Sequence, residues 1–261
     1  MSGRIGWYLR LMGVGLRTHV LHMSRSGFEQ VTTLVSPLVY ATLAVYLFRA
    51  GEHSDRLLQA AVGAGLMGVW SSVLFGSGGA IQDQRWLGTL ESLVAAPAPL
   101  PLVLLPITFA TAVVGMYSML ATVLWGVVLF DVPLAPAAPA LFVPAVVVVV
   151  VSLGMTGLLM AATFVLLRNA NALANALDYP VWMLSGMLVS TTVLPAWTHP
   201  ITWILPTSWG ARAVQAATGG GDVLWPAAMA LVTGALYVVL ALAALVWVER
   251  RARDAGTLAL T

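Results

Sequence analysis

Residues 82–91, QDQRWLGTLE, form a polar island between two apolar segments that are each long enough to cross a lipid bilayer. These segments run from about Leu57 to Ala80 and from about Pro101 to Phe130. A helix needs roughly 20 mostly apolar residues to cover the ~30 Å hydrocarbon core. Because the surrounding chain is built for lipid, we expect the island to form an amphipathic helix that contacts another molecule in water.

The composition is that of an integral membrane protein. Of 261 residues, 60% are hydrophobic and only 8% are charged. A soluble globular domain carries roughly 25% charged residues, so most of this surface is expected to face lipid. The apolar runs are long and lack the ten-residue alternation of a membrane barrel. We therefore expect an all-α polytopic membrane protein with one transmembrane domain over residues 1–261.

Two gaps in the composition exclude several functions. All 12 basic residues are arginine, whereas a Walker A loop needs a lysine on the nucleotide phosphates, so ATP hydrolysis would require another polypeptide. There is no cysteine, which excludes disulfides and thiolate metal sites. His19 and His22 lie three residues apart without a third ligand nearby, so neither a metal site nor a catalytic residue is predicted. The arginines are too scattered for nucleic-acid binding.

Six transmembrane helices are expected along the chain. They cover about residues 31–48, 57–80, 101–130, 140–167, 172–194 and 223–248. With six spans, both termini and the island share one side, which carries nine arginines against three on the other. Because cytoplasmic loops are enriched in arginine, this side is assigned to the cytoplasm. The residue usage is typical of a bacterium, so the expected location is a bacterial cytoplasmic membrane.

Residues 4–25 are predicted to form an amphipathic helix at the membrane surface. Apolar residues recur at helical spacing on one face, and Arg10 and Arg17 lie on the opposite face. Basic residues on the polar face of such a helix point toward lipid headgroups. A short first span is the alternative, against which the arginines argue.

Residues 195–221 are apolar but are interrupted by prolines at positions 195, 200 and 206. The pieces are too short to span the bilayer, and a seventh span would place the three C-terminal arginines outside. We therefore expect short re-entrant or interfacial helices on the outer side, between spans five and six. Irregular backbone at membrane depth is tolerated only against protein or a water-filled cavity.

Small residues recur four positions apart in two spans, for example Ala61 and Gly65 in the second and Gly157 and Ala161 in the fourth. This spacing lets helices approach one another closely. We expect it to serve packing within one subunit, with a contact between subunits as the alternative.

Two residues of the fifth span are candidates for a transport pathway. Asp178 lies about two helical turns into the span, and a carboxylate at membrane depth is by default a functional candidate. Asp178 could instead pair with Arg168 or lie near the water-exposed cytoplasmic end of the span. Trp182 and the tryptophans that follow it could stack on sugar rings, although an aromatic belt at the outer interface also explains them.

Three stretches resemble the type-two ABC export permeases. Around the island, Arg85, the run Gly88-Thr89-Leu90-Glu91 and Pro97 resemble the arginine, Gly-Thr-Leu-Glu and proline signature of that family. Residues 184–187 and 194–197, LSGM and LPAW, resemble the segment that leaves its fifth span. Residues 205–209, LPTSW, resemble the step before its last span. The resemblance covers nearly the whole chain.

The resemblance implies that the chain is the permease subunit of an ATP-driven exporter. Two copies, or this chain and a homologue, would form the pathway in the lipid and bind two separate ABC ATPase subunits. ATP and Mg²⁺ would bind to those ATPases, so no cofactor is expected in this chain. The island would be the coupling helix that docks on the ATPase, with the N-terminal helix beside it. Its expected contact residues are Asp83, Arg85, Trp86, Gly88, Thr89, Leu90 and Glu91.

Three functions remain as alternatives, because no polar group in the spans is specific for one ligand. The first is export of an amphipathic or hydrophobic compound, such as a drug, a natural product or a lipid, with antibiotic resistance as one consequence. The second is export of a polysaccharide or glycolipid. The third is a non-transporting membrane anchor for an ATPase.

Overall fold

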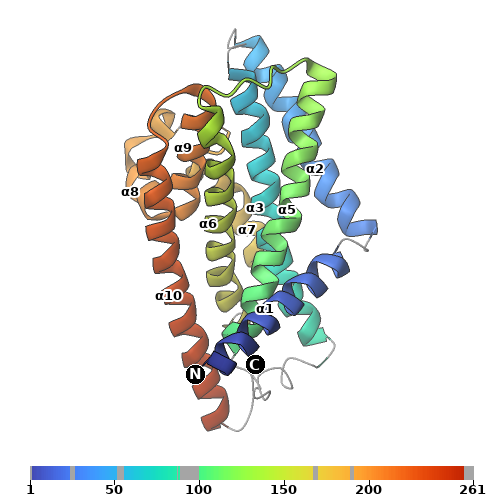
Figure 1. Cartoon of the computed structure of the whole chain (residues 1–261), viewed down its shortest axis with the longest axis vertical. Helices are drawn as coiled ribbons and strands as arrows, with labels where there is room; N and C mark the ends of the chain where they lie inside the picture. The colour runs from blue at the N-terminus through green and yellow to red at the C-terminus, as the bar shows by residue number, and fades with distance from the viewer. Residues whose placement is uncertain are drawn as a thin grey trace.

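The computed structural model describes residues 2–23, 27–51, 56–86, 88, 100–166, 170–188 and 191–255, and within these ranges it contains helices and no strand (Figure 1). The α-helices are α1 (Ser2–Met23), α2 (Gly27–Ala50), α3 (Leu57–Trp86), α5 (Leu100–Phe130), α6 (Pro139–Leu166), α7 (Ala170–Ser185), α8 (His199–Ile204), α9 (Pro206–Gly219) and α10 (Leu224–Ala255). Two 3₁₀ turns, Thr191–Val193 and Ala196–Thr198, lie between α7 and α8. The predicted all-α fold is confirmed for the described part of the chain.

Four helices contain apolar stretches long enough to cross a membrane. These stretches are Leu57–Gly79, Pro101–Phe130, Pro139–Leu166 and Leu224–Arg250. They coincide with the second, third, fourth and sixth expected spans. In α2 the apolar part among the described residues, Leu38–Ala50, is shorter. A polytopic helical membrane protein is therefore confirmed, whereas the six-span layout stays a prediction.

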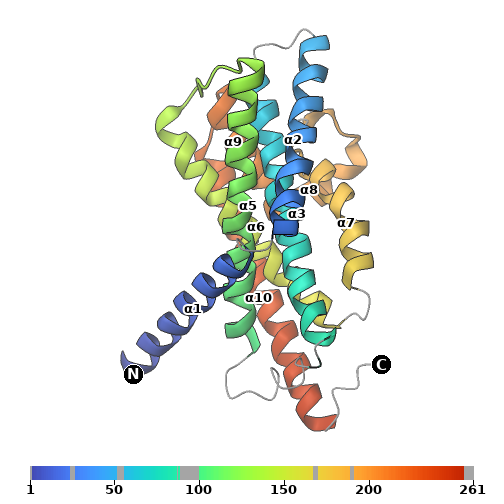
Figure 2. The same cartoon turned by 90° about the vertical axis from the view of Figure 1, so that its right-hand side faces the viewer.

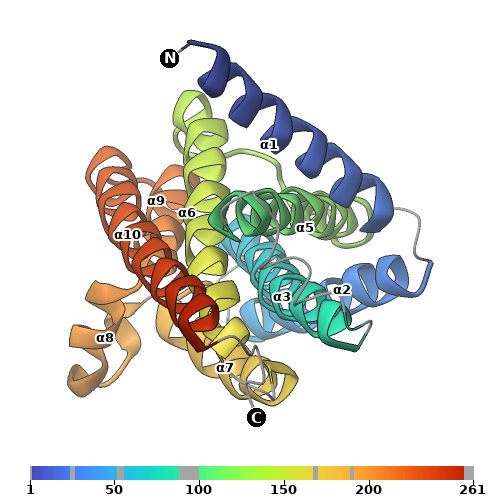
Figure 3. The same ribbon diagram turned by 90° about the horizontal axis from the view of Figure 1, so that it is seen from below.

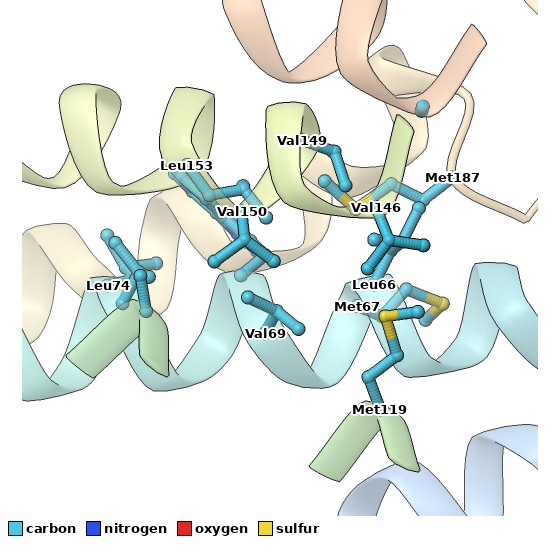
Figure 4. Packing of buried hydrophobic residues seen from close by; sticks show 14 of the residues in the cluster. Leu66, Met67, Val69, Leu74, Met119, Val146, Val149, Val150, Leu153 and Met187 are labelled. Atoms are coloured by element: carbon cyan, nitrogen blue, oxygen red, sulfur yellow. The ribbon is translucent and has the colours of Figure 1, made fainter. Parts of the chain in front are cut away.

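Helix α3 lies at the centre of the bundle, in contact with α2, α5, α6 and α7 (Figure 3). Figure 4 shows apolar side chains of α3 and α6 packed against each other, with Met119 of α5 and Met187 nearby. Those of α3 are Leu66, Met67, Val69 and Leu74, and those of α6 are Val146, Val149, Val150 and Leu153. Lipid tails are as apolar as these side chains, so close packing is what holds such helices together in a membrane.

Small residues make this close packing possible. A Cβ added to Gly65 would lie 2.9 Å from Cγ of Met119, and one added to Gly157 would lie 2.5 Å from Cγ1 of Val73 in α3. Neither approach leaves room for a larger residue without a shift of its neighbour. The prediction that small residues serve packing within one subunit is confirmed at these two positions.

The helix of the fifth expected span ends earlier than the apolar pattern predicts. Helix α7 ends at Ser185 rather than at Leu194, and Gly186 follows with a φ of +71°. This left-handed conformation is the one in which glycine commonly ends a helix. The 16 residues of α7 rise about 24 Å, which is less than the ~30 Å of a hydrocarbon core. The prediction of one continuous helix to Leu194 is therefore wrong.

Two short helices occupy the range in which short helices were expected. Helices α8 and α9 each begin at or beside a proline, which is favoured in the first helical turn because it has no N–H to pair there. Helix α9 is buried along most of its length and packs against α6 and α10. Its last turn accepts hydrogen bonds from the backbone N–H groups of Ala137 and Ala138, at 3.1 and 3.0 Å. This burial fits the re-entrant alternative, while the outer location stays a prediction.

Helix α1 lies across α5 and runs obliquely away from the bundle (Figure 2). The contact is close at Gly15, where an added Cβ would lie 3.0 Å from Cβ of Pro106 in α5. Arg10 and Arg17 are exposed, whereas Leu16 and Val20 are half-buried. The helix itself agrees with the prediction, whereas its amphipathic character and its position on a membrane surface stay predictions.

Candidate functional site

The first half of the polar island is part of α3. The helix continues past the apolar stretch that ends at Gly79 and reaches Trp86, and Gly88 follows in a turn with a φ of +65°. This end of α3 lies at the same end of the bundle as α1 and the C-terminal turns of α10 (Figure 1). The island therefore begins as an extension of the second expected span, and its cytoplasmic location stays a prediction.

Most of the expected coupling residues lie outside the described part of the chain. This holds for Thr89, Leu90 and Glu91, and for the side chains of Asp83, Arg85 and Trp86. Gly88 is described, and its backbone is exposed. The roles of these residues in docking an ATPase stay predictions.

Asp178 of α7 is buried against α3. Its side chain is 7% exposed and accepts a hydrogen bond of 2.9 Å at Oδ1 from Ser71 Oγ. Its backbone carbonyl accepts a second bond of 3.2 Å from the indole Nε1 of Trp70. Among the described residues no arginine pairs with this carboxylate, and Arg168, the alternative partner, lies outside them. Helices α3 and α7 thus share an ionisable group in an otherwise apolar interior.

Aromatic residues lie near Asp178 on α7 and α2. The rings of Tyr179 and Trp182 meet edge to face with centroids 6.1 Å apart. The Tyr40 hydroxyl, from α2, lies close to Tyr179 and Asp178. Nε1 of Trp182 is buried without an acceptor, whereas a tryptophan of an interfacial belt turns its N–H toward water. Asp178 and Trp182, which the sequence predicts as pathway residues, are therefore one helical turn apart in one polar cluster formed by α2, α3 and α7.

A second polar junction joins the two stretches that follow the fifth span in the sequence. Oγ of Ser185 and Oγ1 of Thr207 lie 2.5 Å apart, so residues 184–187 and 205–209 are in contact. Nε2 of Gln215 in α9 donates to the carbonyl of Gly186, at 2.5 Å. Nε2 of Gln59 in α3 donates in turn to the backbone carbonyl of Gln215, at 3.2 Å. These bonds connect α3, the end of α7 and α9 inside the bundle.

Several residues of these two clusters are not predicted as site residues by the sequence. Ser71 and Trp70 lie within an apolar run, where a single hydroxyl or indole gives no signal of its own. Gln59 and Gln215 are better candidates from the sequence than Ser71 and Trp70, because an amide in an apolar segment needs a hydrogen-bond partner when it is buried. No group of three histidine or acidic side chains that could hold a metal ion occurs within the described ranges.

Long apolar helices that enclose two polar clusters define a polytopic helical membrane protein. A family model described as ABC-2 type transporter matches residues 11–218, from within α1 to the end of α9. The chain therefore belongs to the ABC-2 type transporter family, as its resemblance to the type-two ABC export permeases predicts. A comparison with curated proteins gave no match.

Membership of this family gives the chain a general role. The ABC-2 membrane domain is the permease component of an ABC exporter, and ATP is hydrolysed by a separate ATPase subunit. Permeases of the family normally work with an ABC ATPase as partner.

Proposed function

We propose that the chain is the permease subunit of an exporter for an amphipathic or hydrophobic compound, in a bacterial cytoplasmic membrane with both termini in the cytoplasm. The observation that carries the substrate class is the carboxylate of Asp178, the one buried carboxylate among the described side chains, which is held by Ser71 and lies on the same helix as the paired rings of Tyr179 and Trp182. One ionisable group among aromatic and apolar side chains suits a compound with one polar group and a large apolar part. A polysaccharide would need polar partners along its whole length, so glycan export is the less favoured alternative.

In this proposal two permease subunits and two ATPase subunits form the complex. Each ATPase binds ATP with Mg²⁺, and its closure displaces the polar island that docks on it. Such work requires that ATP bind one conformation of the complex more tightly than the other.

Helix α3 is the mechanical link from the island to the Asp178 cluster. It runs without a break from Leu57 to Trp86, so the island and Ser71 belong to one rigid element. Fifteen residues separate Ser71 from Trp86, which corresponds to about 22 Å along a helix. A displacement of the island is therefore transmitted to the carboxylate and moves it relative to Tyr40 of α2. Coupling through one packed helix needs no other pathway between the two sites.

Substitution of the island tests the coupling role. Arg85→Ala and Glu91→Ala are each expected to reduce substrate-stimulated ATP hydrolysis about ten-fold, because each removes a charged contact with the ATPase. The measurement uses the permease reconstituted with its ATPase in proteoliposomes, where transport is followed in parallel. Both variants should remain monodisperse in detergent, since the island is expected to lie in water in the free permease.

Arg49→Ala is the matched control for these two variants. Arg49 ends α2 at the other end of the bundle, where its guanidinium donates to the carbonyl of Phe130 and lies 5.8 Å from the centroid of that ring. Its loss should leave the stimulation of ATP hydrolysis unchanged. Wild-type stimulation and transport in both island variants would count against the coupling role. A wild-type complex whose ATPase no compound stimulates would favour the membrane-anchor alternative.

A further inference from the structure

Arg212 is an arginine inside the bundle that no coupling or pathway role accounts for. It lies on α9, most of whose residues are buried, and its own side chain is half-buried. A charged side chain at membrane depth is costly and is retained where it has a partner or a function. Helices α8 and α9 lie in the half of the bundle away from α1 and the C-terminal end of α10 (Figure 1).

The protein satisfies this guanidinium only in part. Nη2 donates to Oγ1 of Thr202 in α8, at 3.2 Å, and Cζ lies 4.7 Å from the centroid of the Trp209 ring. Nε is buried and has no acceptor. A guanidinium has five N–H donors in a planar fork and accepts no hydrogen bond. Arg212 therefore keeps a buried donor for which the protein provides no acceptor, and no described carboxylate pairs with its charge.

Ser208 provides a second free polar group beside the first. Its side chain is 0% exposed, and Oγ has no hydrogen-bond partner. Residues four apart on a helix lie on the same face, so Ser208 and Arg212 are neighbours on one side of α9. That side is opposite the one on which Gly210 packs against Val149 and Ser152 of α6. Two independent orphan donors, one charged and one neutral, thus lie together within α9.

An oxyanion is the group that would satisfy both donors. Arginine binds carboxylates and phosphates through paired N–H bonds, and a serine hydroxyl adds a third. The neighbouring helix α8 exposes apolar side chains, with Trp203 55% and Ile204 62% exposed. An amphiphile could lay its hydrocarbon chain along this surface while its anionic group reaches Arg212.

We propose that Arg212 and Ser208 bind the phosphate or carboxylate group of an anionic amphiphile. Thr202 and the Trp209 ring hold the guanidinium in place, so that Nε faces the ligand. The site lies apart from the Asp178 cluster, and its existence does not depend on which compound the protein exports. The proposed ligand is an anionic lipid, because α8 offers apolar surface for its hydrocarbon chain, and the choice of probe distinguishes it from a small free oxyanion.

Thermal unfolding of the full chain in maltoside micelles tests the site. Dioleoyl phosphatidylglycerol is titrated as the anionic probe, dioleoylglycerol as the matched lipid without phosphate, and inorganic phosphate as the free oxyanion. A ligand that binds only the folded state raises the unfolding midpoint, and the rise increases with the ratio of its free concentration to its dissociation constant. Wild type should be stabilised by phosphatidylglycerol and not by dioleoylglycerol. Equal stabilisation by inorganic phosphate at matched concentration would identify a free oxyanion as the ligand.

Two variants and one control assign the effect to these residues. Arg212→Gln should lower the apparent affinity for phosphatidylglycerol at least about ten-fold, and Ser208→Ala about three- to ten-fold. Arg49→Gln is the control, because Arg49 is also predicted on the outer side but already has the Phe130 carbonyl as its acceptor. Its titration should match that of the wild type.

Ser208→Ala also separates a binding site from a packing role. Removing a buried hydroxyl that has no partner is neutral or stabilising in the free protein. The unfolding midpoint without lipid should therefore stay the same or rise, while the shift caused by phosphatidylglycerol becomes smaller. An unchanged lipid-dependent shift in both Arg212→Gln and Ser208→Ala would overturn the proposal.

Discussion

Replacing Asp178 by asparagine is expected to lower export at least about ten-fold while the chain stays folded, which corresponds to about 1.4 kcal/mol of lost transition-state or binding free energy. Asparagine keeps an oxygen that accepts the hydrogen bond from Ser71 Oγ, and it leaves the backbone carbonyl that accepts from Trp70 Nε1. Only the ionisable group is removed. Because an unpaired carboxylate is costly to bury, the unfolding midpoint should stay the same or rise. Export is measured in proteoliposomes that contain the permease and its ATPase.

Ser71→Ala is the matched control for this prediction. It removes the hydroxyl that binds Oδ1 and leaves the carboxylate in place. A smaller loss of export than that of Asp178→Asn is expected, since the ionisable group remains. Unchanged export by Asp178→Asn would remove the carboxylate from the transport pathway and leave it a packing role between α3 and α7.

Replacing Gly63 by alanine is expected to prevent normal packing of the bundle. A Cβ at this position of α3 would lie 2.2 Å from the carbonyl oxygen of Met187 and 3.1 Å from its carbonyl carbon. Both atoms belong to the backbone, so no side-chain rotation can relieve the overlap. Overpacking of this kind typically costs about 1–3 kcal/mol, and a clash with backbone lies at the upper end. The measurement is the monodisperse fraction in size-exclusion chromatography, together with the thermal unfolding midpoint.

Gly79→Ala provides a control in the same helix. A Cβ at Gly79 meets nothing within 4 Å. Alanine is also the better helix former, by about 1 kcal/mol, so this variant should be as stable as the wild type or more so. If Gly63→Ala and Gly79→Ala unfold at the same temperature, the close approach of α3 to Met187 does not contribute to stability.

Hydrophobicity predicts most of the long helices of this chain. The second, third, fourth and sixth expected spans match apolar stretches of α3, α5, α6 and α10, because a run of about 20 apolar residues depends on no distant contact. The end of α7 could not be predicted in this way. Met187 and Leu188 are apolar, so hydrophobicity does not indicate the end of the helix, which is followed by Gly186 with a positive φ.

The end of α3 within the polar island could not be predicted from hydrophobicity either. A change from apolar to polar side chains predicts where a helix leaves the lipid, but not where the helix ends. Backbone hydrogen bonds continue through Gln82–Trp86 because no glycine or proline interrupts them before Gly88. Gly88 could have been identified as the end, since glycine in the left-handed conformation is common just after the last helical turn.

Some residues of the candidate sites could be predicted from the sequence, and others could be found only from the structure. A lone carboxylate in an apolar run was enough to select Asp178, because few reasons exist to keep such a group in lipid. Its partner Ser71 and the orphan donors of Ser208 and Arg212 depend on how α3, α7, α8 and α9 are packed. Packing of this kind leaves no pattern in a single sequence, so these residues could be found only from the structure.

The hydrogen bonds from Gln59 to Gln215 and from Gln215 to Gly186 have a consequence for motion. Both glutamines are half-buried, so breaking either bond would cost part of the free energy of desolvating an amide or a carbonyl. Helices α3 and α9 and the end of α7 should therefore move as one rigid body during a transport cycle. Helix α5 is joined to the same body by the hydrogen bond from Ser72 Oγ to the carbonyl of Thr111, at 3.0 Å, so relative motion is expected at the contacts of α2 rather than at those of α5.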